Sequence, residues 1–225
     1  MRRQFIEVSH KIEAGMKTYP GLPEPREEVI LDYDASHARY GGLSEFYIAS
    51  LHLCGNTGTY VDSPVHRHRG AADLSQLPLE RLAHVPAVLV NATDWTEDQP
   101  GIGPDAFRGL DLRGKAVLVQ TGFSRHWRTD RYLERNPFLT ADACDYLLNQ
   151  GIAFAGIDSL NIDDIGDLVR PAHTKLLGAG VPVCEHMTNL EALAADPDGW
   201  RIHAVPIAWV GGATFPVRAY LLREG

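Results

Sequence analysis

Three short runs of mostly apolar residues constrain the fold of this chain more than any other feature. They cover residues 87–90, 116–120 and 152–157. Runs of this length and composition are typical of strands that are buried on both faces of a sheet. Between the second and third runs, residues 140–151 have a helical pattern, with a threonine placed to cap the first turn and a glycine placed to end the last. Strands that alternate with a helix in this way indicate an α/β domain.

Several further elements complete this pattern. We expect strands at residues 5–8, 46–53, 204–209 and 216–222, and short helices at residues 173–178 and 188–193. Strands outnumber helices, and no internal repeat, low-complexity segment or linker divides the sequence. We therefore predict a single domain over residues 1–225 with a β-rich α/β fold, in which a mixed sheet or barrel-like core is flanked by a few helices.

The charge and the cysteines of the chain narrow the range of partners. The formal net charge of −8 argues against binding to nucleic acid or to an anionic membrane. No apolar run approaches the roughly 20 residues that a membrane-spanning helix needs, and the N-terminus lacks the apolar core of a signal peptide. Cys54, Cys144 and Cys184 form no CxxC pair, which is typical of reduced thiols. We expect a soluble cytoplasmic protein whose partner is a small molecule.

Polar residues capable of chemistry follow the expected strands at three places. These are Asp62 with His66, Asp158 with Ser159, and His173 with Glu185. Carboxylates and imidazoles gathered from separate segments can bind a divalent metal or form an acid–base set. Each residue also has a simpler interpretation, because an aspartate before Ser-Pro often forms a turn and a single histidine more often lies at the surface. Taken alone, these residues indicate a candidate metal or acid–base site and no more.

The stretch NTGTYVDSPVH, residues 56–66, resembles the HxGTHxDxPxH signature of the cyclase family that includes bacterial kynurenine formamidase and isatin hydrolase. Other segments resemble that family in the same order along the chain: residues 8–10 with 19–21, residues 120–124, residues 156–159, and His173 with residues 183–190. The resemblance covers nearly the whole chain. It implies the family's swivelling β/β/α-type fold and assembly into homodimers or homotetramers.

The resemblance also implies roles for individual residues. In family members with two zinc ions, both histidines of HxGTH and the aspartate bind the first ion. The aspartate bridges to a second ion, which a downstream histidine and glutamate complete, and the last histidine of the signature is the acid–base catalyst. By position, Asp62, His173 and Glu185 take metal-binding roles here, and His66 takes the catalytic role.

Two positions depart from the family signature. Asn56 and Tyr60 stand where the family has the two histidines of the first ion. An amide oxygen is a poor zinc ligand beside imidazole, and a tyrosine must lose a proton of pKa about 10 before it binds a metal well. We therefore expect at most one divalent ion, Zn²⁺ or Mn²⁺, bound weakly or not at all. Asn56 then becomes a substrate contact, and Tyr60 joins Asp62 and His66 as a catalytic residue.

Three functions are consistent with these residues. The first is hydrolysis of a small aromatic or cyclic amide, formamide or lactone. Formylkynurenine itself is not the expected substrate, because in the family its hydrolysis goes with the intact metal site. The second is ring closure or proton transfer without hydrolysis or metal, with Tyr60 as the acid and His66 with Asp62 as the proton-handling pair. The third, a non-catalytic binding protein, is least favoured because four of the family's site residues are present.

Two further expectations concern the surroundings of the site. Tyr19 stands where the family has an aromatic residue that lines the pocket, in a loop of residues 15–23 too apolar to be left in solvent. We expect this loop to reach a neighbouring subunit's pocket. His52 and Cys54 would share a strand face with Asn56, which would direct them to the pocket, although core packing is more typical of such a cysteine.

Overall fold

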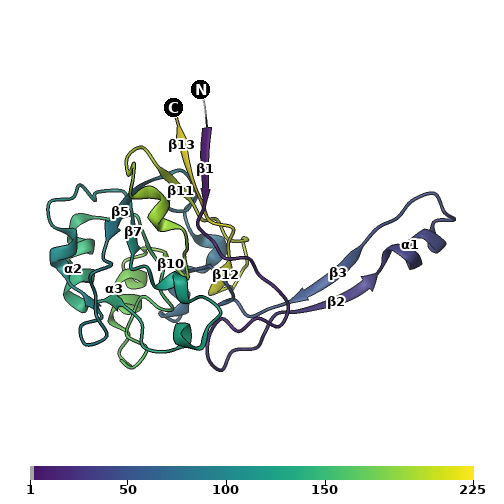
Figure 1. Cartoon of the computed structure of the whole chain (residues 1–225), viewed down its shortest axis with the longest axis horizontal. Coiled ribbons are helices and arrows are strands. Elements are labelled where there is room, and N and C mark those ends of the chain that lie inside the picture. The colour runs from purple at the N-terminus through teal and green to yellow at the C-terminus, as the bar shows by residue number, and fades with distance from the viewer. Residues whose placement is uncertain (1–2) are drawn as a thin grey trace.

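The computed structural model, which describes residues 3–225, is built on a mixed nine-stranded sheet (Figure 1). The strand order is β1-β13-β11-β5-β7-β9-β10-β4-β12, and the sheet curls into a half-barrel. Its strands are β1 (Arg3–Glu7), β4 (Tyr60–Asp62), β5 (Val85–Asn91), β7 (Ala116–Gln120), β9 (Phe154–Ile157), β10 (Val183–Glu185), β11 (Arg201–His203), β12 (Thr214–Pro216) and β13 (Tyr220–Glu224). A small parallel pair, β6 (Gly101–Ile102) with β8 (Phe138–Leu139), lies apart from it.

The three apolar runs of the sequence form the centre of this sheet, as predicted. Strands β5, β7 and β9 pair in parallel, and β10 adds to β9 in the same direction. All five residues of β7 are buried, and its four apolar residues alternate between two cores. Val117 and Val119 belong to the core that includes residues of the two helices, whereas Ala116 and Leu118 belong to the core on the other face. The fold class is therefore confirmed.

Two helices cover one face of the sheet. Helix α2 (Ala141–Gln150) is capped by the Thr140 hydroxyl and ends at Gly151, which adopts a left-handed conformation with φ of 72°, as the sequence predicted. Helix α3 (Pro171–Gly178) begins two residues earlier than expected, with a proline in its first turn. No helix within residues 3–225 is long and apolar enough to cross a membrane.

Three predictions about the C-terminal part were wrong in detail. The expected helix at 188–193 is only a single 3₁₀ turn, Leu190–Leu193. The expected strand at 204–209 has no regular structure, because Pro206 cannot donate a hydrogen bond to a neighbouring strand. The expected strand at 216–222 is split between β12 and β13, which lie at opposite sides of the sheet.

A long hairpin, which was not predicted from the sequence, projects from the body of the protein. The predicted strand at 46–53 contains β3 (Ile48–His52), which pairs antiparallel with β2 (Arg26–Leu31) in a separate two-stranded sheet. Helix α1 (Tyr33–Arg39), capped by the Asp32 carboxylate, lies at the far end (Figure 1). We call residues 26–52 the arm.

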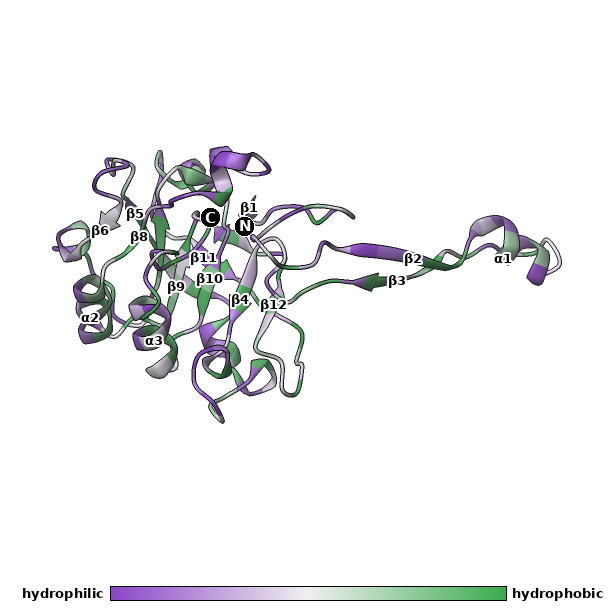
Figure 2. Cartoon of the chain, turned by 90° about the horizontal axis from the view of Figure 1, so that it is seen from below, coloured by the Kyte–Doolittle hydropathy of each residue, from purple (hydrophilic) through white to green (hydrophobic). Residues whose placement is uncertain are grey.

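The arm exposes an unusual number of large apolar side chains. Figure 2 shows hydrophobic segments along β3 and at the end of β2, far from either core. The exposed residues are Val29, Ile30, Tyr33, Tyr40, Leu43, Phe46, Tyr47, Ile48 and Leu51. An isolated two-stranded hairpin is marginally stable in water, and an exposed apolar surface of this kind marks an interaction site. The arm is thus the natural contact for the homo-oligomer that we propose.

Removal of the arm tests this proposal. Arg26 and His52 oppose each other in the hairpin, so an Asn-Gly turn can join them in place of residues 27–51. We expect the native chain to be a dimer or tetramer and the shortened chain to be a monomer. Light scattering at micromolar concentration measures both masses, and circular dichroism checks that the body stays folded. A native monomer, or an oligomer that survives removal of the arm, would contradict the proposal.

Candidate functional site

The pairing of β4 with β10 brings three of the predicted residues together. In this antiparallel pair Glu185 lies opposite Tyr60, and Val183 lies opposite Asp62. Residues directly opposite each other share a face of the sheet, as do residues two apart on one strand. Tyr60, Asp62 and Glu185 therefore point to the same side. The Tyr60 hydroxyl donates a hydrogen bond of 2.5 Å to Glu185 Oε2.

Helix α3 supplies His173 to the same face, and Asp163 fixes its orientation. The Nδ1 atom of His173 lies 2.6 Å from Asp163 Oδ2. Asp163 also accepts hydrogen bonds from the backbone N–H groups of Ala172 and His173 in the first turn of α3. A carboxylate in this position fixes the tautomer and the ring orientation of a histidine, as it does for metal-binding histidines. The imidazole Nε2 therefore faces into the site.

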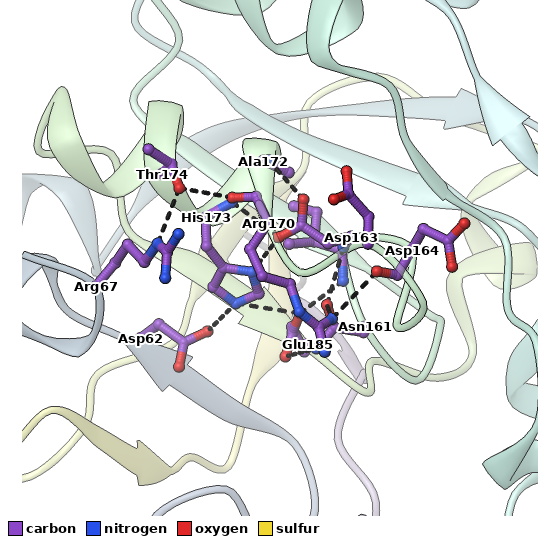
Figure 3. A network of polar contacts seen from close by, with 12 residues as sticks. Asp62, Arg67, Asn161, Asp163, Asp164, Arg170, Ala172, His173, Thr174 and Glu185 are labelled. Atoms are coloured by element: carbon purple, nitrogen blue, oxygen red, sulfur yellow. Dashed lines mark hydrogen bonds and ion pairs between the residues drawn. The ribbon is translucent and has the colours of Figure 1, made fainter.

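The three predicted metal-binding residues converge around this nitrogen. His173 Nε2 lies 3.6 Å from Asp62 Oδ2 and 3.5 Å from Glu185 Oε1. Figure 3 shows Asp62 and Glu185 on the side of the imidazole away from Asp163. Burial lowers the pKa of His173, but the neighbouring carboxylates, Glu185 first, outweigh burial and raise that pKa well above its ordinary value. Without another cation, the imidazolium balances the buried negative charges.

Asp62 is the residue that most clearly fits a metal ion. Its side chain is fully buried, and neither carboxylate oxygen has a hydrogen-bond partner within the described residues. A buried carboxylate without hydrogen bonds is costly unless a cation faces it. One ligand atom each from Asp62, His66 and His173 lie within 4.8 Å of one another. This set of one carboxylate and two imidazoles matches the donors that divalent zinc prefers.

Glu185 is more constrained than the sequence suggested. Its Oε1 accepts a 2.6 Å hydrogen bond from the backbone of Ile162, and its Oε2 accepts the bond from Tyr60. Burial raises the pKa of Glu185 to about 7, against the opposing effects of His173 and the two donors. Its role as a metal ligand stays a prediction. Burial also raises the pKa of Tyr60 well above its ordinary value, so Tyr60 remains a protonated donor.

A cavity of about 380 Å³ opens over these residues. Its walls come from Tyr19, Pro20, Gly21, Leu22, Asn56, Tyr60, His66, Arg67, Asn161, Arg170, His173 and Glu185. The predicted substrate contacts Tyr19 and Asn56 are both in this wall. Tyr19 lines the cavity of its own chain, and the expectation that its loop reaches a neighbouring subunit stays a prediction. His66 lies on the short 3₁₀ turn after β4, one third exposed, with Nε2 3.8 Å from Asp62 Oδ1.

Four other candidates lie outside the cavity. The Asp158 carboxylate accepts hydrogen bonds from the backbone and hydroxyl of Thr121 and from the backbone of Gly122, and burial raises its pKa to about 6. The Ser159 hydroxyl donates to a backbone carbonyl. Both shape the turns at the strand ends. His52 is exposed on the arm near Glu28, and Cys54 is half-buried.

Sequence reasoning missed Asp163, Asn161 and the two arginines of the cavity. Asp163 stands eight residues before Pro171, too far for a capping pattern to reveal it. Arginines in polar segments give no sequence signal of their own, because most of them are solvated.

Comparisons with known proteins show similarity in sequence and in fold. The family model described as putative cyclase matches residues 6–164. The kynurenine formamidase of Salinibacter ruber is 28% identical over 221 residues, which is 96% of each chain. A solved structure titled as a potential metal-dependent hydrolase with cyclase activity is 26% identical, covers both chains completely and superposes with a TM-score of 0.77. Isatin hydrolase A from Labrenzia aggregata, 19% identical, shares the fold with a TM-score of 0.83 over 99% of this chain and 94% of its own.

Asp163 offers a test of the site's construction. We expect Asp163→Asn to weaken Zn²⁺ binding by about 10- to 100-fold, because the histidine loses the carboxylate that orients it. Equilibrium dialysis measures the affinity, and circular dichroism confirms folding. Asp164→Asn is the matched control, since that side chain bonds only to a nearby loop backbone. Equal Zn²⁺ affinity in the two variants would contradict the role assigned to Asp163.

Proposed function

The chain belongs to the putative cyclase family, and on that premise we propose that it is a metal-dependent hydrolase of a small aromatic amide, formamide or cyclic amide. One observation supports the proposal most strongly. The Asp62 carboxylate is fully buried, has no hydrogen-bond partner within the described residues, and lies beside the imidazoles of His66 and His173. The relatives named kynurenine formamidase and the neighbour titled as a potential metal-dependent hydrolase support this class of reaction.

The residues fit one divalent cation. Asp62 and His173 would hold it with Glu185 as the third ligand, which leaves His66 to carry protons. When bound, such an ion acidifies water and polarises a carbonyl oxygen. We propose that the site takes at most one ion, because Tyr60 and Asn56 occupy two positions that the family signature gives to histidines. The high pKa of the Tyr60 phenol disfavours the phenolate that a metal would need.

His66 has the geometry of a proton carrier in this reaction. Its ring lies at the mouth of the cavity, next to Asp62 and 5.7 Å, centroid to centroid, from the ring of His173. It can take a proton from the attacking water and deliver it to the nitrogen of the leaving amine as the carbon–nitrogen bond breaks. Asn56 accepts a hydrogen bond from Thr214 through its side-chain oxygen, so its amide nitrogen, which lies beside the Tyr60 hydroxyl, can donate its remaining N–H to the substrate carbonyl.

The alternative function, ring closure or proton transfer without a metal, is supported by one contact. The Tyr60–Glu185 hydrogen bond joins a buried phenol to a carboxyl group whose pKa is about 7. Such a pair can transfer a proton without a metal, as a ring-closing enzyme would require. A non-catalytic binding role has no comparable observation in its favour.

Substitution of His66 tests the hydrolase proposal. With metal-loaded protein and an aryl formamide such as formanilide, we expect His66→Ala to lower kcat by about 10²- to 10⁴-fold, the usual contribution of a positioned acid–base group. Zn²⁺ affinity, measured in parallel, should change little. His52→Ala, on the exposed arm, is the control and should keep full activity.

Two results would contradict this assignment. Native metal-loaded protein that hydrolyses neither aryl formamides nor cyclic aryl amides would exclude the proposed function. A loss of Zn²⁺ affinity in His66→Ala that parallels the loss of rate would show that His66 binds the metal instead of carrying the proton.

A further inference from the structure

Two side chains join the turn that carries His66 to the helix that carries His173. They are Arg67 and His68, which directly follow His66 in the sequence. Both reach Thr174, the residue after His173 in α3. Figure 3 shows the Arg67 side chain directed toward Thr174. Neither side chain has a part in the proposed reaction, since the metal ligands and the proton carrier account for its chemistry.

Three hydrogen bonds make this connection. The Nε of Arg67 donates to the Thr174 hydroxyl oxygen at 2.9 Å, and one terminal nitrogen donates to the Val169 carbonyl at 2.8 Å. The Nε2 of His68 donates to the backbone carbonyl of Thr174 at 2.9 Å. These lengths are those of well-formed hydrogen bonds, and they link elements 107 positions apart in the sequence. We call Arg67, His68 and Thr174 the clamp.

The His66 imidazole depends on its turn for its position, because little else holds the ring. Within residues 3–225 its ring nitrogens make no hydrogen bond, and Nε2 lies 3.8 Å from Asp62 Oδ1. His173 differs, because Asp163 fixes its ring at 2.6 Å. A proton carrier works only within hydrogen-bond reach of the reacting atoms. The placement of the His66 turn against α3 therefore decides whether the ring can act.

The two elements are each well formed without the clamp. In the turn, the backbone N–H of His66 donates to the Ser63 carbonyl at 2.9 Å, and that of Arg67 donates to the Pro64 carbonyl at 3.1 Å. In α3, Asp163 orients His173 and accepts from its backbone. What the clamp adds is the relation between the turn and the helix.

We propose that Arg67 is a positioning residue, which holds His66 close to His173 through its bonds to Thr174 and Val169. This inference rests on the proposed hydrolase function and adds a residue that acts through His66. A guanidinium suits the role, because its planar fork holds two acceptors in fixed directions. Its partners here are uncharged oxygens, so the geometry of the side chain matters more than its charge.

Removal of the guanidinium tests the proposal. With metal-loaded protein and formanilide, we expect Arg67→Met to lower kcat by about 10- to 100-fold, because misplacement of a reacting group by about 1 Å can cost that much. KM and Zn²⁺ affinity should stay within about threefold of native, whereas loss of a substrate contact would raise KM. Arg69→Met is the matched control with full activity expected, because Arg69 is exposed on the same turn and lies outside the cavity wall.

The other end of the clamp gives an independent variant. Thr174→Val keeps the shape of the side chain and removes the hydroxyl, so we expect kcat to fall as it does in Arg67→Met. Thr174→Ser restores the hydroxyl and should keep kcat within about threefold of native. Failure of one variant to fold therefore leaves the other informative.

A double variant shows whether Arg67 acts through His66. In the His66→Ala background, Arg67→Met should change kcat by less than about twofold, because no imidazole is left to misplace. Two losses that multiply would show that Arg67 acts on the substrate or the metal directly, and the inference would be overturned. A native kcat in Arg67→Met would overturn it as well.

A measurement without any reaction separates this inference from the proposed function. In metal-free protein with ¹³C-labelled histidine, nuclear Overhauser contacts report on the rings of His66 and His173, whose centroids are 5.7 Å apart. The rings of His84 and His203, also 5.7 Å apart, provide a reference contact. His66→Ala identifies the His66 signal. We expect the contact between His66 and His173 to weaken relative to the reference in Arg67→Met.

The two measurements fail in different ways. If no aryl amide is hydrolysed but the contact between His66 and His173 is present and weakens in Arg67→Met, the proposed function is wrong and the clamp stands. If native protein hydrolyses formanilide but the ring contact is unchanged in Arg67→Met, the inference is overturned and the hydrolase proposal survives. Absence of the ring contact in native protein would also overturn the inference.

Discussion

The buried carboxylate of Asp62 is the constraint on which the rest of the site depends. A carboxylate without hydrogen bonds in a protein interior needs a positive charge beside it. His173 provides that charge when its imidazole is protonated, and a divalent cation provides it when His173 binds through a neutral nitrogen. A metal and a proton therefore compete for the same place, which is the usual relation between metal affinity and pH at histidine sites. Asp163 orients His173 in both the protonated and the metal-binding state, because its carboxylate accepts a hydrogen bond from the Nδ1–H group in each.

Two features of the fold place these charged side chains at the site. The register of β4 against β10 places Tyr60 beside Glu185 and turns Asp62 to the same face. The first turn of α3 then brings His173 over that face, and the loop before α3 supplies Asp163 for orientation. The Tyr60 hydroxyl donates a hydrogen bond to Glu185, so a protonated phenol stands where the family signature has an imidazole. This arrangement is the basis of our proposal that the site takes at most one cation beside a protonated phenol.

Sequence reasoning predicted the parts of this structure that depend on local pattern. The runs at 116–120 and 152–157 gave central strands because their burial on both faces requires continuous apolar residues. Thr140 and Gly151 marked the ends of α2 because helix caps have local signatures. The arm escaped prediction, since its apolar residues look like those of a core strand and only their exposure in the folded chain distinguishes the two. Asp163, Arg67 and Arg170 escaped because their positions near His173 depend on where a loop returns in space.

The number of metal ions per chain distinguishes a one-ion site from the two-ion site of the family signature. Elemental analysis of protein purified without chelator and then dialysed against Zn²⁺ or Mn²⁺ gives this number. We expect at most one ion per native chain, none in Asp62→Asn, and an additional ion in the double variant Asn56→His with Tyr60→His, which restores both imidazoles of the signature. Two ions in the native chain, with Asn56 or Tyr60 as a ligand of one of them, would contradict this expectation.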